Sequence, residues 1–78
     1  MPDLRLFAAA REVAGTDHDV VDGDTVGAVL DGAVDRYGPG FAEILGSCKV
    51  WVNGEPAERD DPVGESDEVA VLPPVSGG

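Results

Sequence analysis

The chain has 78 residues, which allows one domain with a small hydrophobic core but not two. Its 16 acidic and 5 basic residues give a formal net charge of −11, which argues against nucleic acid or an anionic membrane as a direct partner. The single cysteine excludes an internal disulfide and a cysteine-based metal site, and we expect no bound metal. No apolar run approaches the roughly 20 residues that cross a bilayer, so we expect a cytoplasmic protein. An acidity of this kind is typical of a high-salt (halophilic) cytoplasm.

In the first third of the chain, residues 4–8 alternate between apolar and other side chains, which predicts a strand with one buried face. Residues 9–13 favour a short helical turn that Gly15 can end in the left-handed region. Residues 17–22 are a plausible second strand. The two strands would then form a hairpin or a wide meander.

A long amphipathic helix is predicted next, with Thr25 as its N-cap. Its apolar positions recur at the spacing of one helix face: Val26, Val29, Leu30, Ala33, Val34 and Tyr37. The segment Gly38-Pro39-Gly40 stops it. Phe41, Ile44 and Leu45 then indicate a short second helix at one end of the core.

The last third is predicted to hold the remaining strands. Residues 48–52 read as a strand, and Asn53-Gly54 is a strong hairpin signal. Residues 56–62 are too interrupted by turn residues for a long central strand, and residues 69–72 are the final strand. The expected fold is therefore α+β, a mixed sheet of four to five strands with the main helix packed on one face. We expect one domain over residues 1–72 and an extended tail over residues 73–78.

Side-chain parity divides the sheet into two faces. The inward set, which can point at the helix, is Leu4, Leu6, Val50, Val52, Val69 and Val71. The outward set is Arg5, Phe7, Lys49, Trp51, Ala70 and Leu72. Because no second long helix remains to cover the outward face, Phe7, Trp51 and Leu72 should form an exposed apolar patch beside the tail, a candidate docking surface. The alternative is that residues 56–66 fold over this face.

No catalytic constellation is evident within the body of the protein. His18 is the only imidazole and lies between two aspartates, so a surface strand residue is favoured over a base or ligand. Cys48 has inward parity, which favours a buried, inert thiol over a nucleophile. The acidic pairs, such as Asp60-Asp61, lack calcium-loop spacing.

The C-terminal tail is the strongest functional signal in the sequence. Pro73 and Pro74 end the last strand, because proline cannot donate a ladder hydrogen bond, and they stiffen the arm that follows. Gly77 and Gly78 have no Cβ, so a partner can close around the backbone from every side. The carboxylate of Gly78 is therefore a candidate reacting group. Adenylation by a partner, with ATP, would make it an acyl electrophile. The alternative interpretation is a frayed terminus.

These features resemble the small subunit of molybdopterin synthase, the MoaD family, within the ThiS/MoaD and ubiquitin-like β-grasp group. The resemblance covers nearly the whole chain. It rests on Leu6-Phe7-Ala8 with Arg11-Glu12-Val13-Ala14-Gly15, on Thr25-Val26, on Val52-Asn53-Gly54, and on Asp67-Glu68-Val69-Ala70 running into Pro73-Pro74-Val75-Ser76-Gly77-Gly78. It implies a β-grasp fold and a sulfur carrier that is not an enzyme by itself.

The resemblance also implies partners and site residues. An E1-like enzyme would adenylate Gly78 with ATP, a persulfide source would convert it to a thiocarboxylate, and the large synthase subunit would use the sulfur to build molybdopterin in a heterotetramer. The residues Pro74, Val75, Ser76 and Gly77 would occupy the partner's tail channel. Phe7, Leu72, Trp51, Arg5 and Pro56 would belong to the partner-binding patch. Pro56 departs from the family pattern, in which a larger aliphatic residue is common, and Trp51 offers compensating apolar area.

Two further functions stay open. Archaeal relatives can be joined to lysines of target proteins as ubiquitin-like modifiers, or can donate sulfur to transfer RNA, and both begin with the same adenylate. The third possibility is a β-grasp interaction module whose tail never reacts.

Overall fold

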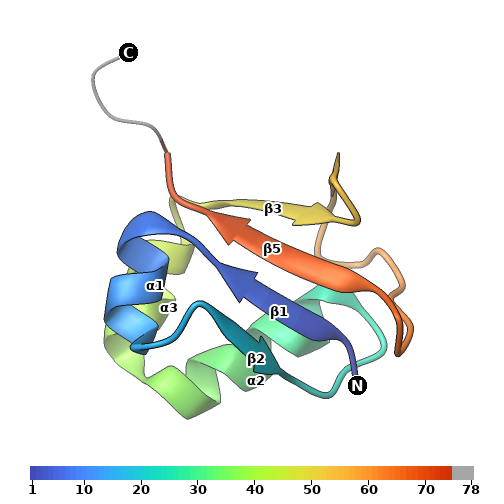
Figure 1. Cartoon of the computed structure of the whole chain (residues 1–78), viewed down its shortest axis with the longest axis horizontal. Helices are drawn as coiled ribbons and strands as arrows, with labels where there is room; N and C mark the ends of the chain where they lie inside the picture. The colour runs from blue at the N-terminus through green and yellow to red at the C-terminus, as the bar shows by residue number, and fades with distance from the viewer. Residues whose placement is uncertain (75–78) are drawn as a thin grey trace.

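The computed structural model describes residues 1–74, which form a five-stranded mixed sheet and three helices (Figure 1). The strand order is β2-β1-β5-β3-β4. The predicted α+β class is confirmed, and five strands is the upper end of the predicted range. Within residues 1–74 no helix combines the length and the apolar character that crossing a membrane requires.

The first and last strands within residues 1–74 form the centre of the sheet. β1 (Asp3–Leu6) pairs in parallel with β5 (Glu68–Leu72), so that Leu6 lies opposite Val71. β2 (His18–Val20) pairs antiparallel with the other edge of β1. It is shorter than the predicted strand over residues 17–22. This central parallel pair places the start of the tail next to the loop that follows β1.

The predicted hairpin is present, but its second strand is very short. β3 (Lys49–Val52) pairs with β5 on one side and with β4 (Glu55–Pro56) on the other. Asn53 and Gly54 join β3 to β4 and both have positive φ, 51° and 84°, as a type I′ turn requires. β4 consists of two residues, and Ala57 after it donates one further N–H to the Val50 carbonyl of β3 at 2.9 Å.

The structure contains three helices, whereas the sequence predicts two and a helical turn. α1 (Ala8–Ala14) is a full helix that ends at Gly15, whose φ of 80° is in the predicted left-handed region. α2 (Val26–Tyr37) begins at the predicted cap, where the Thr25 hydroxyl accepts the Ala28 N–H at 3.1 Å. α3 (Pro39–Leu45) follows after Gly38. Figure 1 shows α1 and α3 at the end of the sheet where β1 and β5 finish.

The core lies between the sheet and α2 and follows the predicted parity only in part. The inward residues of β1 and β5 are at most 1% exposed, and they pack with the apolar face of α2: Leu4, Leu6, Val69 and Val71 with Val26, Val29, Leu30 and Ala33. Phe41 of α3 is fully buried at the end of this core. Val50 and Val52 also have inward parity but are only half-buried. The helix layer therefore covers the centre of the sheet better than it covers β3.

Candidate partner-binding face

The outward face of the sheet carries a continuous row of side chains that is set by the strand register. Arg5 lies opposite Ala70, Ala70 opposite Trp51, and Trp51 opposite Pro56. Directly opposed residues in a sheet place their side chains on the same face. The predicted patch residues Arg5, Trp51 and Pro56 are therefore brought into one row that crosses four strands.

Phe7 and Leu72 form the next row toward the tail. Leu72 lies opposite Lys49, and the Phe7 N–H donates to the Val71 carbonyl at 3.3 Å, which places Phe7 beside the end of β5. Phe7 is 42% exposed, and Trp51 and Leu72 are half-buried. A shallow hollow of about 200 Å³ is lined by Phe7, Trp51, Gly54, Glu68, Ala70 and Leu72. We call this surface, together with Arg5 and Pro56, the outer patch.

Arg5 supplies a cation at the β1 side of the outer patch. Its Nη1 atom is 3.9 Å from the Glu68 carboxylate, and its buried Nε–H has no hydrogen-bond partner within residues 1–74. A buried donor without a partner carries a desolvation cost, which an incoming acceptor can relieve. The outer patch thus combines apolar area with one unused donor.

The alternative in which residues 56–66 cover this face is excluded by where that segment lies. The Asp61 carbonyl accepts the Val26 N–H at 2.9 Å and the Arg59 carbonyl accepts the Gly27 N–H at 2.7 Å. The Val63 N–H donates to the Asp24 carbonyl at 2.9 Å. These bonds hold the segment against the start of α2, on the opposite side of the sheet, and the outer patch is left open.

The tail begins where the outer patch ends. Leu72 is the last residue of β5 and belongs to the patch, Pro73 is half-buried and Pro74 is exposed. The remaining predicted tail residues, Val75, Ser76, Gly77 and Gly78, lie outside the described residues. The assigned roles of the patch and of the tail stay predictions.

The side chains that the sequence singled out for possible chemistry lie elsewhere. His18 is exposed on β2, with Nε2 at 3.3 Å from the Asp3 carboxylate, as expected for a surface strand residue. Cys48 lies just before β3. It is half-buried, not fully buried as predicted. Its Sγ donates to the Ile44 carbonyl at 3.2 Å, and desolvation raises the pKa of the thiol. Within residues 1–74 there is no cluster of three metal-ligating side chains.

Three contributors to the hollow, Gly54, Glu68 and Ala70, are absent from the predicted patch, although Ala70 was assigned to the outward face. Gly54 and Glu68 line it because the hairpin turn and the start of β5 lie beside Trp51 and Ala70. Parity alone could not identify Gly54, which has no side chain. Glu68 has the same parity as Ala70 and Leu72, so extending the strand by one residue would have found it.

The comparison with known proteins settles the family. The ThiS family model matches residues 4–78. The chain belongs to the ThiS family. It is therefore one of the ubiquitin-like β-grasp proteins that act as sulfur carriers or modifiers, and such small proteins are not enzymes themselves.

Individual relatives are similar along almost their whole length. The chain is 39% identical to small archaeal modifier protein 1 of Haloferax volcanii, over 97% of this chain and 99% of that protein. The solution structure of small archaeal modifier protein 1 from Methanosarcina acetivorans is 31% identical, with a TM-score of 0.88 over 97% of this chain and 94% of that one. A putative molybdopterin converting factor subunit 1 from Pyrococcus furiosus is 25% identical, with a TM-score of 0.79 over 94% and 95% of the two chains. The expected β-grasp fold is thus confirmed.

Proposed function

We propose that this ThiS-family protein carries sulfur as a thiocarboxylate on Gly78 and donates it in molybdopterin biosynthesis. An E1-like adenylating enzyme would activate the Gly78 carboxylate, and the large subunit of molybdopterin synthase would accept the sulfur in a heterotetramer. The observation that carries the proposal is the position of the outer patch at the origin of the tail. Leu72 belongs to both, so a partner bound to the patch holds the tail at a fixed starting point.

The chemistry proceeds in two displacements at the acyl carbon of Gly78. The carboxylate oxygen attacks the α-phosphate of ATP, pyrophosphate leaves, and an acyl adenylate forms. A sulfide nucleophile then attacks the acyl carbon, the C–O bond to AMP breaks, and the thiocarboxylate remains. The adenylating enzyme supplies the ATP site, because the described residues form no phosphate-binding loop. This chain supplies recognition and the reacting carboxylate.

The second candidate function is protein modification, in which a lysine amine of a target protein displaces AMP and an amide bond forms at Gly78. The observation that favours it is the 39% identity to small archaeal modifier protein 1 over nearly the whole chain. Sulfur donation to transfer RNA would use the same thiocarboxylate. All of these outcomes share the adenylate and the outer patch.

The first test measures adenylation with variants of the outer patch. The chain is incubated with ATP, labelled pyrophosphate and the E1-like enzyme of its own genome, and the exchange of pyrophosphate into ATP that depends on this chain is followed. We expect Phe7→Ala and Trp51→Ala each to lower the specificity constant by at least about tenfold, because truncating an aromatic anchor costs roughly 2 kcal/mol of binding. Val20→Ala is the matched control, since Val20 is 37% exposed on the outer edge strand and lies outside the patch. Equal effects of all three substitutions would contradict the proposal.

The second test separates the candidate functions by mass spectrometry of protein from its native cells. Sulfur transfer predicts a form in which one sulfur atom replaces one oxygen at Gly78, whereas modification predicts a Gly-Gly remnant on target lysines. Deleting Gly77 and Gly78 should abolish both products without unfolding the domain, because the core lies within residues 1–74. Normal molybdoenzyme activity in the deletion strain would reject the molybdopterin role. If no adenylate forms with the E1-like enzyme in the first test either, the remaining interpretation is an interaction module whose tail does not react.

A further inference from the structure

β2 forms one free edge of the five-stranded sheet. An edge strand ordinarily exposes unpaired N–H and C=O groups, to which another chain can add a strand. Asp17 and Val21, on either side of β2, both bond toward β1: the Asp17 carbonyl accepts at 3.0 Å and the Val21 N–H donates at 3.2 Å. Because the direction of the backbone groups alternates along a strand, those of His18 and Val20 point away from the sheet.

All four of these outward-pointing groups are bonded to side chains. The Thr16 hydroxyl accepts the His18 N–H at 3.3 Å and donates to the His18 carbonyl at 2.9 Å. The Asp19 carboxylate accepts the Val20 N–H at 2.8 Å, and Arg36 Nη1 donates to the Val20 carbonyl at 3.0 Å. Three side chains therefore occupy the positions that an incoming strand would need.

The side chains beside Val20 are held in place by further contacts. Arg36 Nη1 also lies 2.7 Å from the Asp19 carboxylate, which receives another hydrogen bond from the Tyr37 hydroxyl. Arg36 and Tyr37 are the last residues of α2, so the end of this helix takes part in closing the edge. A strand that displaced these side chains would replace existing hydrogen bonds by new ones and would still lose the entropy of association.

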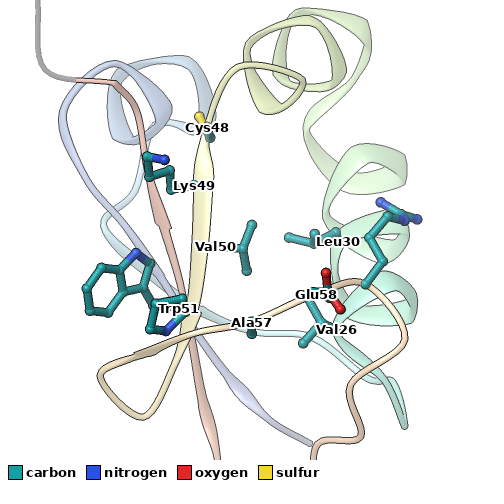
Figure 2. Close-up of a pocket in the computed structure, with 10 residues that line it drawn as sticks. Val26, Leu30, Cys48, Lys49, Val50, Trp51, Ala57 and Glu58 are labelled. Carbon is teal, nitrogen blue, oxygen red and sulfur yellow. The ribbon is translucent and has the colours of Figure 1, made fainter.

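β4, at the opposite edge of the sheet, offers no outward N–H. The Ala57 N–H donates to the Val50 carbonyl at 2.9 Å, so Pro56 before it is the residue of β4 whose backbone points outward. Proline has no N–H. Figure 2 shows the chain crossing from there through Ala57 and Glu58 toward the helix that carries Leu30. The two outermost strands are thus closed by different means, by side chains at β2 and by proline at β4.

We propose that Thr16, Asp19 and Arg36 keep the protein monomeric by closing β2 against strand addition by a second copy of this chain. Two copies related by a twofold axis at Asp19 would pair His18 of each with Val20 of the other and form four backbone hydrogen bonds. In the intact protein, side chains block all four bonds. The two Asp19 carboxylates would also lie directly opposite each other, which destabilises a strand pair. This closure is independent of the outer patch and of the tail chemistry.

The test opens the edge with the triple variant Thr16→Ala/Asp19→Ala/Arg36→Ala, which removes one acid and one base and therefore keeps the net charge at −11. Sedimentation is measured in about 1 M KCl, where charge repulsion is screened beyond about 3 Å. We expect the wild type to be monomeric at about 1 mM and the triple variant to dimerise with a dissociation constant of about 1 mM or lower. Concentration-dependent amide shifts of the ¹⁵N-labelled variant should centre on His18 and Val20. A monomeric triple variant, or a wild type that dimerises through β2, would overturn the proposal.

The matched control is Asp31→Ala/Arg59→Ala, which removes another exposed ion pair of α2 with the same balance of charge and leaves β2 intact. We expect this variant to stay monomeric under the same conditions. Equal dimerisation of the control would show that loss of an ion pair, and not the opening of β2, causes association. Shifts of the triple variant centred on Phe7 and Trp51 would place the contact on the outer patch. Either result would overturn the proposal.

The single variant Thr16→Ala decides the question if the triple variant does not fold, because it leaves the contacts of Asp19 with α2 in place. We expect its His18 amide hydrogen to exchange with solvent at least about fivefold faster than in the wild type, because that N–H loses its acceptor. The Val20 amide keeps its bond to Asp19 and should exchange at the wild-type rate. An unchanged rate at His18 would show that Thr16 does not occupy the edge and would overturn the proposal.

Discussion

Among single residues, Asp19 shows how a carboxylate joins an edge strand to a helix. It receives hydrogen bonds from the Tyr37 hydroxyl and from Arg36, whose Nη1 is 2.7 Å from Oδ2. Arg36 also donates to the Val20 carbonyl at 3.0 Å. The Tyr37 hydrogen bond, followed by that of Arg36, lowers the pKa of Asp19 from 3.8 to about 2. Burial, and then the bond to Asp19, raises the pKa of Tyr37 to about 12.

This network predicts a loss of stability in acid. Because the pKa of Asp19 is lower in the folded state, its contribution is complete above pH 4 and disappears as the pH falls from about 4 to about 2. The contribution is at most about 2 kcal/mol, because Asp19 keeps some contact with water. We expect Asp19→Asn to lower the free energy of unfolding by up to this amount at pH 5 and to have little effect at pH 2. Urea unfolding followed by circular dichroism measures the difference.

Asp31→Asn provides the comparison for that experiment. Asp31 also pairs with an arginine, but its side chain is 72% exposed, so the pair is screened by solvent. Its effect should be small at both pH values. A difference between wild type and Asp19→Asn that stays constant from pH 5 to pH 2 would show that the carboxylate does not titrate as described.

Residue parity was predictable from sequence, but the surroundings of each residue were not. The alternation of Leu4 with Arg5 and of Val69 with Ala70 correctly separates the two faces of β1 and β5. The same rule gives Val50 an inward direction but cannot say that α2 stops short of it. The Asp19 to Tyr37 bond joins residues 18 apart, and no local pattern identifies such a pair.

Among the elements, α2 has the start that sequence predicts, but its first turn is also held by a distant segment. The Thr25 cap satisfies one free N–H, and the carbonyls of Asp61 and Arg59 satisfy those of Val26 and Gly27. The approach at Gly27 is close: a Cβ there would lie 3.0 Å from the Arg59 carbonyl oxygen. Residues 58–61 therefore act as a backbone cap for α2.

This contact predicts that two helix glycines respond to alanine with opposite signs. Glycine to alanine inside a helix ordinarily stabilises by up to about 1 kcal/mol. We expect that gain at Gly40 of α3, where a Cβ would meet only Val13 Cγ1 at 3.7 Å. We expect Gly27→Ala instead to destabilise the domain by about 1 kcal/mol or more, because the Arg59 carbonyl must move and its hydrogen bond weakens. Thermal unfolding of both variants compares the signs, and a gain at Gly27 would contradict the close contact.

The elements differ in how well sequence anticipates them, for physical reasons. α2 has a cap, a periodic apolar face and a glycine stop, and the Asn53-Gly54 turn has the residues that positive φ requires. α1 has none of these signals at its start: Phe7 provides no side-chain cap and Ala8 has a φ of 51°. It forms because Ala10 is buried against the core. The path of residues 56–66 depends on backbone hydrogen bonds to α2, which leave no mark in the sequence.

For the molecule as a whole, the dominant feature is a net charge of −11 on 78 residues. Self-repulsion of this size opposes compaction, and dissolved ions screen it. Four pairs between a carboxylate and an arginine or the N-terminal amine are formed within residues 1–74, and all of them involve exposed or partly exposed groups. Such pairs contribute little to offset the repulsion.

The charge predicts that salt stabilises the fold. We expect the melting temperature to rise as KCl increases from 0.1 M to 1 M, over which the screening length falls from about 10 Å to about 3 Å. Sucrose at equal osmolality is the control, because it lacks ions but also favours compact states. A melting temperature that does not change with KCl, or that rises equally in sucrose, would contradict the role of charge and the prediction of a high-salt cytoplasm.

The parallel pairing of β1 with β5 has a consequence for how the protein is made. The two central strands come from opposite ends of the domain, so a nascent polypeptide lacks the middle of its sheet until residues 68–72 have been translated and have left the ribosome. A prematurely terminated product would present neither Ala70 and Leu72 nor the shape that holds Phe7 and Trp51 together. Recognition of the outer patch would then also act as quality control, because only translation products that include all of β5 would be bound by a partner.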